Sequence, residues 1–195
     1  MLKTGLTGSI GSGKTLVSKV FFTLGVPVFH ADDEAKKFLH DAEVKRKIAA
    51  EISESVFDHD ERIINSKLAS IVFNDPQALK KLNKIIHPRV REALKQWFAK
   101  QQDHPYAIYE AAILFESGFY REMDKIITVS APESLRIQRV MKRDGVTEGD
   151  VLKRIRNQWP DEKKLALADW IINNDEKAML IPQVLEIHHR LTVKS

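Results

Sequence analysis

The chain has 195 residues, which suits one compact domain with small insertions, and its 43% hydrophobic and 30% charged residues are ordinary for globular proteins. Cysteine is absent, which excludes disulfides, zinc–thiolate sites, iron–sulfur clusters and cysteine nucleophiles. The first residues lack the apolar stretch of a signal peptide, and no run of about 18 apolar residues occurs. We therefore expect a soluble cytoplasmic protein with no membrane partner.

The positive charge is concentrated in one segment. The chain carries 31 basic and 27 acidic side chains, a surplus of four. Nine basic and five acidic residues lie between Arg136 and Lys164, so this segment alone accounts for the surplus. Such a cluster indicates either a solvated helix face or a polyanionic partner, which would be nucleic acid, an acidic membrane or a ligand with several phosphates.

The chain begins with a predicted strand from Leu2 to Thr7, followed by a glycine-rich turn and a helix from Lys14 to about Leu24. A second short strand, Val26 to Phe29, is predicted to run on to Asp32 and Asp33. Two strands that flank one helix form a βαβ unit, which is typical of a parallel sheet.

Helical patterns dominate from about residue 33 to 102, with a break at 57–62 and helix starts at 74–76 and His87-Pro88. The sheet resumes with apolar runs at 106–109 and 125–129, and 170–172 is a last strand. Helices at 132–143 and 148–158 carry the basic cluster, and an amphipathic helix at 176–191 closes the chain. The pattern predicts a three-layer α/β domain with a parallel sheet and two inserts.

One motif carries chemistry. The eight residues Gly8, Ser9, Ile10, Gly11, Ser12, Gly13, Lys14 and Thr15 fit G-x-x-x-x-G-K-S/T, the phosphate-binding P-loop, between a predicted strand and a predicted helix. Glycines let successive backbone N–H groups curl inward around an anion, and the helix N-terminus adds its positive dipole end. In such loops the lysine reaches the β- and γ-phosphates of a nucleotide and the threonine hydroxyl binds Mg²⁺.

Other nucleotide-binding classes fit poorly. A dinucleotide-binding G-x-G-x-x-G fails, because Leu16 stands where the last glycine belongs. A GTPase is disfavoured, because its two motifs D-x-x-G and N-K-x-D are missing. No aspartate stands three residues before a glycine, and Asn83-Lys84 is not followed by the aspartate of the second motif. A small kinase remains, in which a basic lid closes over the phosphoryl group, and Arg136, Arg139 and Arg143 share a helix face from which all three could reach phosphates.

Three acidic residues are candidates for the remaining chemistry. Asp32 and Asp33 follow the second strand, at the carboxyl edge where such sheets bind ligands, and we assign Asp32 the acceptor hydroxyl and Asp33 a helix N-cap. Glu110 ends the strand predicted beside the P-loop strand and is a candidate for the Mg²⁺ site or for a buried partner of a lid arginine.

The whole chain resembles the dephospho-coenzyme A kinase family. The resemblance is carried by segments in a fixed order: Leu6 to Thr15, Gly25 to Asp32, Ile71 to Phe73, Leu82 to Pro88, Ile113 to Glu116, Arg139 to Asp144, Arg154-Ile155 with Gln158, and Ala168 to Asn174. It implies a P-loop NTPase core (1–30, 105–135 and 165–195), a helical coenzyme-A-binding insert (31–104) and a basic helical lid (136–164).

The resemblance also implies the activity. It is the transfer of the ATP γ-phosphoryl group, with Mg²⁺, to the ribose 3′-hydroxyl of dephospho-coenzyme A, a phosphotransferase reaction on an alcohol group that completes coenzyme A synthesis. Asp32 then orients or deprotonates the hydroxyl, His87 belongs to the substrate side, Arg139 and Arg143 contact phosphates, and Asn174 lies near the adenine of ATP. Together with the P-loop, we expect Lys14, Asp32 and Arg139 to be catalytic and Glu110 to serve substrate and metal.

Three positions depart from the family pattern. His30 stands where many relatives have aspartate, Ala112 replaces a frequent proline, and Asn65 stands about where arginine is common. The departure at position 30 bears on metal or substrate binding, and the one at 65 on a substrate phosphate contact.

Two alternatives stay open on the sequence alone. One is another small-molecule kinase on the same core, such as a nucleoside monophosphate kinase, which differs only in its acceptor. The other is a non-catalytic module that binds nucleic acid or an acidic partner through the basic segment and uses the P-loop as a regulatory nucleotide sensor. The lack of aromatic residues among the arginines of this segment argues against it. We expect no nucleic-acid partner, and a monomer or small homo-oligomer.

Overall fold

The computed structural model describes residues 1–193, which form two compact units. The first contains Met1–His30 and the chain from Trp97 onward, and the second is Ala31–Gln96. The predicted lid, 136–164, groups with the first unit, and the separate roles of core, insert and lid stay predictions. Among residues 1–193 no helix combines the length and the apolar character that crossing a bilayer requires.

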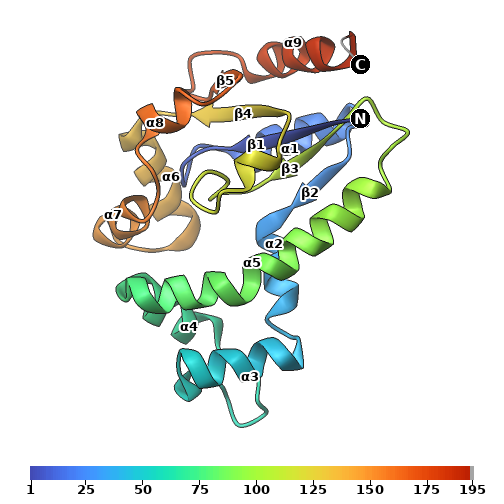
Figure 1. Cartoon of the computed structure of the whole chain (residues 1–195). Coiled ribbons are helices and arrows are strands. Elements are labelled where there is room, and N and C mark those ends of the chain that lie inside the picture. The colour runs from blue at the N-terminus through green and yellow to red at the C-terminus, as the bar shows by residue number, and fades with distance from the viewer. Residues whose placement is uncertain (194–195) are drawn as a thin grey trace. The chain divides into compact units, whose positions relative to one another are not determined.

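The first unit is built on a five-stranded sheet in the order β2-β3-β1-β4-β5, shown in Figure 1. The strands are β1 (Leu2–Thr7), β2 (Val28–His30), β3 (Tyr106–Glu110), β4 (Lys125–Ser130) and β5 (Trp170–Asn173). All four pairings are parallel, with Leu6 and His30 both in register with Glu110. The carboxyl ends of the strands therefore meet at one edge, where the P-loop begins.

Helices and apolar segments cover both faces of this sheet. On one face, α1 (Lys14–Thr23) and α9 (Leu180–Val193) pack on the strands in one buried cluster that includes Leu6, Ile108, Phe21 and Leu191. On the other face lie Leu114 beside Gly5 and Phe119 of η2 (Phe119–Glu122), which stacks on Tyr109. The predicted three-layer α/β fold with a parallel sheet is confirmed.

Three helices lie between β4 and β5. Helices α6 (Glu133–Asp144) and α7 (Glu148–Arg156) share a small core of Ile137, Val140 and Val151. The sequence analysis missed α8 (Asp161–Leu165), because five residues after Pro160 are too short to show a helical period. It also started the closing helix too early, because the Asp175 carboxylate instead accepts hydrogen bonds from the N–H groups of Lys177 and Ala178.

The second unit is helical. It contains α2 (Ala31–Phe38), α3 (Ala42–Glu51), η1 (Glu54–Val56), α4 (Asn65–Asn74) and most of α5 (Pro76–Ala99). The predicted helix start at His87-Pro88 is wrong, because Pro88 lies inside α5. Proline removes one backbone donor and disfavours the preceding turn, but the buried side chains of Ile85, Ile86 and Val90 hold the helix continuous.

The strand before the second unit is shorter than predicted. It ends at His30, and α2 begins at once with Ala31, so Asp32 and Asp33 stand in the first helical turn. Asp33 is therefore not the N-cap that the sequence analysis assigned. Its carboxylate lies 2.9 Å from the Lys36 ammonium, one turn along the same helix.

Candidate active site

The P-loop joins β1 to α1, and its surroundings leave no room for a side chain at Gly11 or Gly13. Gly11 and Gly13 have positive φ angles of 79° and 93°. A Cβ atom on Gly13 would lie 2.1 Å from Nδ2 of Asn174, and one on Gly11 would lie 2.5 Å from the backbone oxygen of Arg136. Both the left-handed backbone and the tight surroundings therefore exclude side chains.

The turn of the loop is closed by its own backbone. The N–H of Ser12 donates to the Ser9 carbonyl at 3.0 Å, and the N–H groups of Leu16 and Val17 donate to Gly13. Lys14 and Thr15 are the first two residues of α1, so they stand at the helix N-terminus, and Thr15 is exposed. This arrangement presents backbone N–H groups and the positive end of the helix dipole to an anion.

Two of the predicted site residues contact the second half of the loop. The side-chain amide of Asn174 donates to the Ser12 carbonyl at 2.8 Å. Arg139 Nη1 donates to the Asn174 carbonyl at 3.1 Å and approaches the Gly11 carbonyl at 3.5 Å, while Nη2 lies 3.1 Å from the Glu176 carboxylate. The structure thus brings Arg139 and Asn174 together at the P-loop.

The other two arginines of that helix face behave differently. Arg143 is largely exposed and binds the Asp144 carboxylate at 2.7 Å, as Arg154 also does. These hydrogen bonds, that of Arg143 first, lower the pKa of Asp144. Arg136 is only 2% exposed, and its guanidinium binds Asp161 at 2.6 Å. The expectation that all three arginines reach phosphates is wrong for Arg136, because α8 supplies an acidic partner, Asp161, that helical spacing does not reveal.

Glu110 lies at the carboxyl end of β3 and is 7% exposed. Its Oε2 lies 2.5 Å from Nδ1 of His30, which the β2–β3 register places directly beside it. His30 is thus the neighbour of the carboxylate that is predicted to bind Mg²⁺. Asp32 follows His30 by two residues along the chain.

The donor set suits Mg²⁺ held together with a nucleotide. Thr15 and Glu110 offer a hydroxyl and a carboxylate, the hard oxygen donors that Mg²⁺ prefers, and this ion commonly uses one or two protein oxygens beside substrate phosphates. Within residues 1–193 no group of three or more histidine, cysteine, aspartate or glutamate side chains could form a metal cage by itself. One hydroxyl and one carboxylate are a donor set that fits Mg²⁺ bound together with a nucleotide.

Asp32 and His87 belong to the second unit. Asp32 stands in the first turn of α2, and His87 lies half-buried in the middle of α5. Burial, and then the positive charge of Arg91, lowers the pKa of His87, so its imidazole is neutral at pH 7. The roles assigned to Asp32 and His87 toward a substrate stay predictions.

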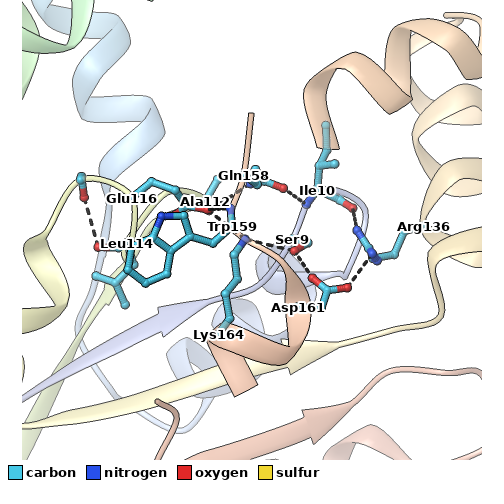
Figure 2. Close-up of polar contacts among 11 residues, drawn as sticks. Ser9, Ile10, Ala112, Leu114, Glu116, Arg136, Gln158, Trp159, Asp161 and Lys164 are labelled. Atoms are coloured by element: carbon cyan, nitrogen blue, oxygen red, sulfur yellow. Dashed lines mark hydrogen bonds and ion pairs between the residues drawn. The ribbon is translucent and has the colours of Figure 1, made fainter. Parts of the chain in front are cut away.

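The sequence analysis missed a group of residues that hold the first half of the P-loop, drawn in Figure 2. Gln158 Oε1 accepts from the N–H of Ile10 at 2.9 Å, and Lys164 Nζ donates to Ser9 Oγ at 3.1 Å. Asp161 accepts from the Ser9 hydroxyl. The spacing of the basic segment gave no sign that some of its members are buried. Only the resemblance singled out Gln158.

Comparison with known proteins places the chain in one family. The family model described as dephospho-CoA kinase matches residues 2–179. A dephospho-CoA kinase of Bacteroides fragilis is 38% identical over 187 residues, covering 95% of this chain and 91% of the relative. The solved dephospho-CoA kinase of Campylobacter jejuni is 26% identical with a TM-score of 0.71, covering 98% of both chains.

A crystal structure of a Thermus thermophilus protein superposes with a TM-score of 0.83 at 31% identity, covering 97% of this chain and 96% of the other. The similarity therefore extends over both units and is not confined to the P-loop. Because the family model and a relative above 30% identity each span most of its length, the chain belongs to the dephospho-CoA kinase family.

Proposed function

We propose that this chain uses ATP to phosphorylate the ribose 3′-hydroxyl of dephospho-coenzyme A, giving coenzyme A and ADP. The observation that carries the proposal is the family match over residues 2–179, together with a P-loop that Arg139 and Asn174 contact directly. The enzyme is thus a transferase of the P-loop kinase type.

The nucleotide side of the reaction is assigned to the first unit. Gln158 holds the Ile10 N–H and the Ser9 carbonyl holds the Ser12 N–H, so other backbone N–H groups of the loop surround the phosphates. Lys14 reaches the β- and γ-phosphates. Arg139 and Arg143 neutralise charge that develops on the transferring group. Asn174, which contacts Ser12 and Gly13 of the loop, is assigned a place near the adenine of ATP.

The acceptor side is assigned to Asp32, with His87, Glu110 and Arg139 as further substrate contacts. The 3′-hydroxyl gives its proton to the Asp32 carboxylate as its oxygen forms a bond to the γ-phosphorus. The bond from that phosphorus to the β–γ bridging oxygen breaks, and the electron pair leaves with ADP. Positioning and charge neutralisation supply most of the rate enhancement in such transfers.

Thr15 and Glu110 would hold Mg²⁺, which would neutralise negative charge on the nucleotide phosphates. The carboxylate of Glu110 would contribute through its position at the carboxyl end of β3, beside the strand that leads into the P-loop.

The enzyme acts in the cytoplasm, as a monomer or small homo-oligomer, without nucleic-acid or membrane partners. The pairing of basic side chains with acidic ones in the segment 136–164 supports only the absence of a polyanionic partner. Arg136 binds Asp161, Arg154 binds Asp144, and Lys164 lies 3.1 Å from Glu116. Charges compensated in this way contribute little to a field that attracts a polyanion.

The test is coupled ADP release with Mg²⁺ and ATP, comparing dephospho-coenzyme A with AMP, CMP, shikimate and no acceptor. ADP formed only with dephospho-coenzyme A, and a product heavier by one phosphate, is the expected result. ADP formed with a nucleotide monophosphate instead would reject the acceptor and favour the nucleoside monophosphate kinase alternative. Binding of nucleic acid that weakens linearly on a log–log plot against salt, without any need for ATP, would favour the non-catalytic module.

A further inference from the structure

Four side chains from the segment 136–164 hold the first half of the P-loop. We call them the P-loop brace: Arg136 of α6, Gln158 after α7, and Asp161 and Lys164 of α8. Figure 2 shows them converging on two consecutive residues of the loop, Ser9 and Ile10. The brace and the loop lie in the same unit.

At Ser9 the brace is a chain of alternating charges. Lys164 is 1% exposed, and its ammonium lies 3.1 Å both from Glu116 and from Ser9 Oγ. The Ser9 hydroxyl donates to Asp161, whose other oxygen accepts from Arg136 at 2.6 Å. Two anions, Glu116 and Asp161, compensate the two buried cations, Lys164 and Arg136, beneath the loop.

At Ile10 the brace is a single carboxamide. Gln158 Oε1 accepts from the Ile10 N–H at 2.9 Å, and its Nε2 donates to the Ala112 carbonyl at 3.1 Å. Arg136 Nη1 approaches the carbonyl of Ile10 at 3.5 Å. Gln158 thus joins the P-loop to the segment that follows β3, two residues beyond Glu110.

Such a link affects how readily the loop binds phosphate. A loop with glycines at positions 8, 11 and 13 has many accessible backbone conformations, and binding must order it. Side chains that already hold the loop in one conformation reduce that entropy cost and raise ligand affinity. Because Gln158 binds the Ile10 N–H directly, its loss frees the loop at that peptide.

We propose that Gln158 is a positioning residue of the kinase, which fixes the P-loop at Ile10 so that the loop binds nucleotide phosphates in a preformed shape. The proposal rests on the proposed function insofar as the bound nucleotide is ATP or ADP. Gln158 acts through the loop backbone and does not touch the nucleotide itself.

The test compares Gln158→Met, which keeps the length of the side chain without its hydrogen bonds, with Gln158→Glu, which keeps an acceptor oxygen for the Ile10 N–H. Gln102→Ala is the matched control, because the Gln102 side chain donates to the backbone carbonyl of Phe98, in the connection before β3. Each protein is assayed for the KM of ATP, the KM of dephospho-coenzyme A, kcat, and melting temperature. ADP affinity is titrated without acceptor.

Because Gln158→Met loses the hydrogen bond to the Ile10 N–H, we expect the KM of ATP and the Kd of ADP to rise about five- to tenfold. The KM of dephospho-coenzyme A should stay within about twofold, and Gln158→Glu should restore most of the ADP affinity. Gln102→Ala should match the unchanged chain. A purely structural role would lower the melting temperature or the active fraction, and leave both nucleotide constants alone.

Unchanged nucleotide constants in Gln158→Met would overturn the proposal. So would a Gln158→Glu variant as impaired as Gln158→Met, because the acceptor bond would then not be the cause. An unchanged chain that binds ADP but does not phosphorylate dephospho-coenzyme A would reject the proposed function alone, since the ADP titration needs no acceptor.

Discussion

Two adjacent aspartates at the start of α2, Asp32 and Asp33, allow the role of Asp32 as the acceptor of the hydroxyl proton to be tested with a matched control. We expect Asp32→Asn to lower kcat roughly 100-fold or more, because the amide cannot accept the hydroxyl proton, while ATP affinity is retained. Asp33→Asn is the control, since the Asp33 carboxylate pairs with Lys36 on the helix surface and should be dispensable. Steady-state kinetics with both substrates measures the difference, and normal turnover in Asp32→Asn would remove the role we assign to it.

Gly13 has a positive φ of 93° and lies against Asn174, whereas Gly25 has a φ of 81° with open space around it. We expect Gly13→Ala to weaken ATP binding at least about tenfold, because a contact of 2.1 Å must displace Asn174 or the loop. Gly25→Ala carries similar backbone strain, about 1 kcal/mol, without the clash. Nucleotide titration and melting together separate the two effects, and equal ATP affinities would contradict the steric argument.

His87 makes the stability of the folded chain depend on pH, and the direction follows from its lowered pKa. Its pKa is lowered by burial, and further by Arg91, so the unfolded chain, with a pKa of about 6.5, binds a proton at a higher pH than the folded chain. This stabilisation is fully present above pH 6.5, roughly, and is lost as the pH falls through the lower folded pKa.

We therefore expect His87→Gln to lose less stability than the unchanged chain when urea unfolding is compared at pH values of about 7.5 and 5.5. His59→Gln is the control, because its side chain is 90% exposed. A pH dependence in His87→Gln equal to that of the unchanged chain would show that His87 does not take part.

Among the elements, α7 has the best-defined start. The Thr147 hydroxyl accepts from the N–H of Asp150, and the Asp150 carboxylate accepts from the N–H of Thr147. We expect Thr147→Ala to lower the free energy of unfolding by about 1 kcal/mol, because a helix N-terminal donor loses its partner. Thr23→Ala, which removes a hydroxyl that donates to Lys19 within α1, should cost less than about 0.5 kcal/mol. Chemical unfolding of both variants checks the order, and the reverse order would contradict it.

The elements that the sequence predicted well are those whose signal is local. β1 was placed at its observed bounds, Leu2–Thr7, because an apolar run leads directly into a glycine-rich turn. Pro88 misled the analysis, because the backbone preference of proline is local while the burial of Ile85 and Val90 is tertiary. The predicted strand past His30 failed for a related reason, since α2 begins without any loop.

In the site, too, residues with a local sequence signal were predictable and residues held by tertiary contacts were not. The P-loop was predictable from eight consecutive residues, and the structure places Arg139 and Asn174 against it. The brace was not predictable, because Lys164 and Ser9 are 155 residues apart and no periodicity relates them. Arg136 was misassigned because helical spacing shows which residues share a face, but does not show which neighbouring element covers it.

At the scale of the whole molecule, the predicted site residues are divided between the two units. The P-loop, Glu110 and the basic segment belong to the first, while Asp32 and His87 belong to the second. The sequence boundary between them lies just after His30, whose ring contacts Glu110 in the first unit. Asp32, which is predicted to act on the acceptor, is thus connected to the sheet through β2, the strand that ends at His30.

Two consecutive lysines of α8 differ completely in access to solvent, so their relative reactivity can report local opening of the fold. Lys163 is exposed, whereas Lys164 is 1% exposed beneath the P-loop. An amine-acylating reagent should therefore modify Lys163 rapidly and Lys164 only when the first unit opens. Peptide mass spectrometry against time would resolve both rates, and equal rates would contradict the burial of Lys164. The ratio of the Lys164 rate to the Lys163 rate then reports the fraction of molecules in which this part of the enzyme is open.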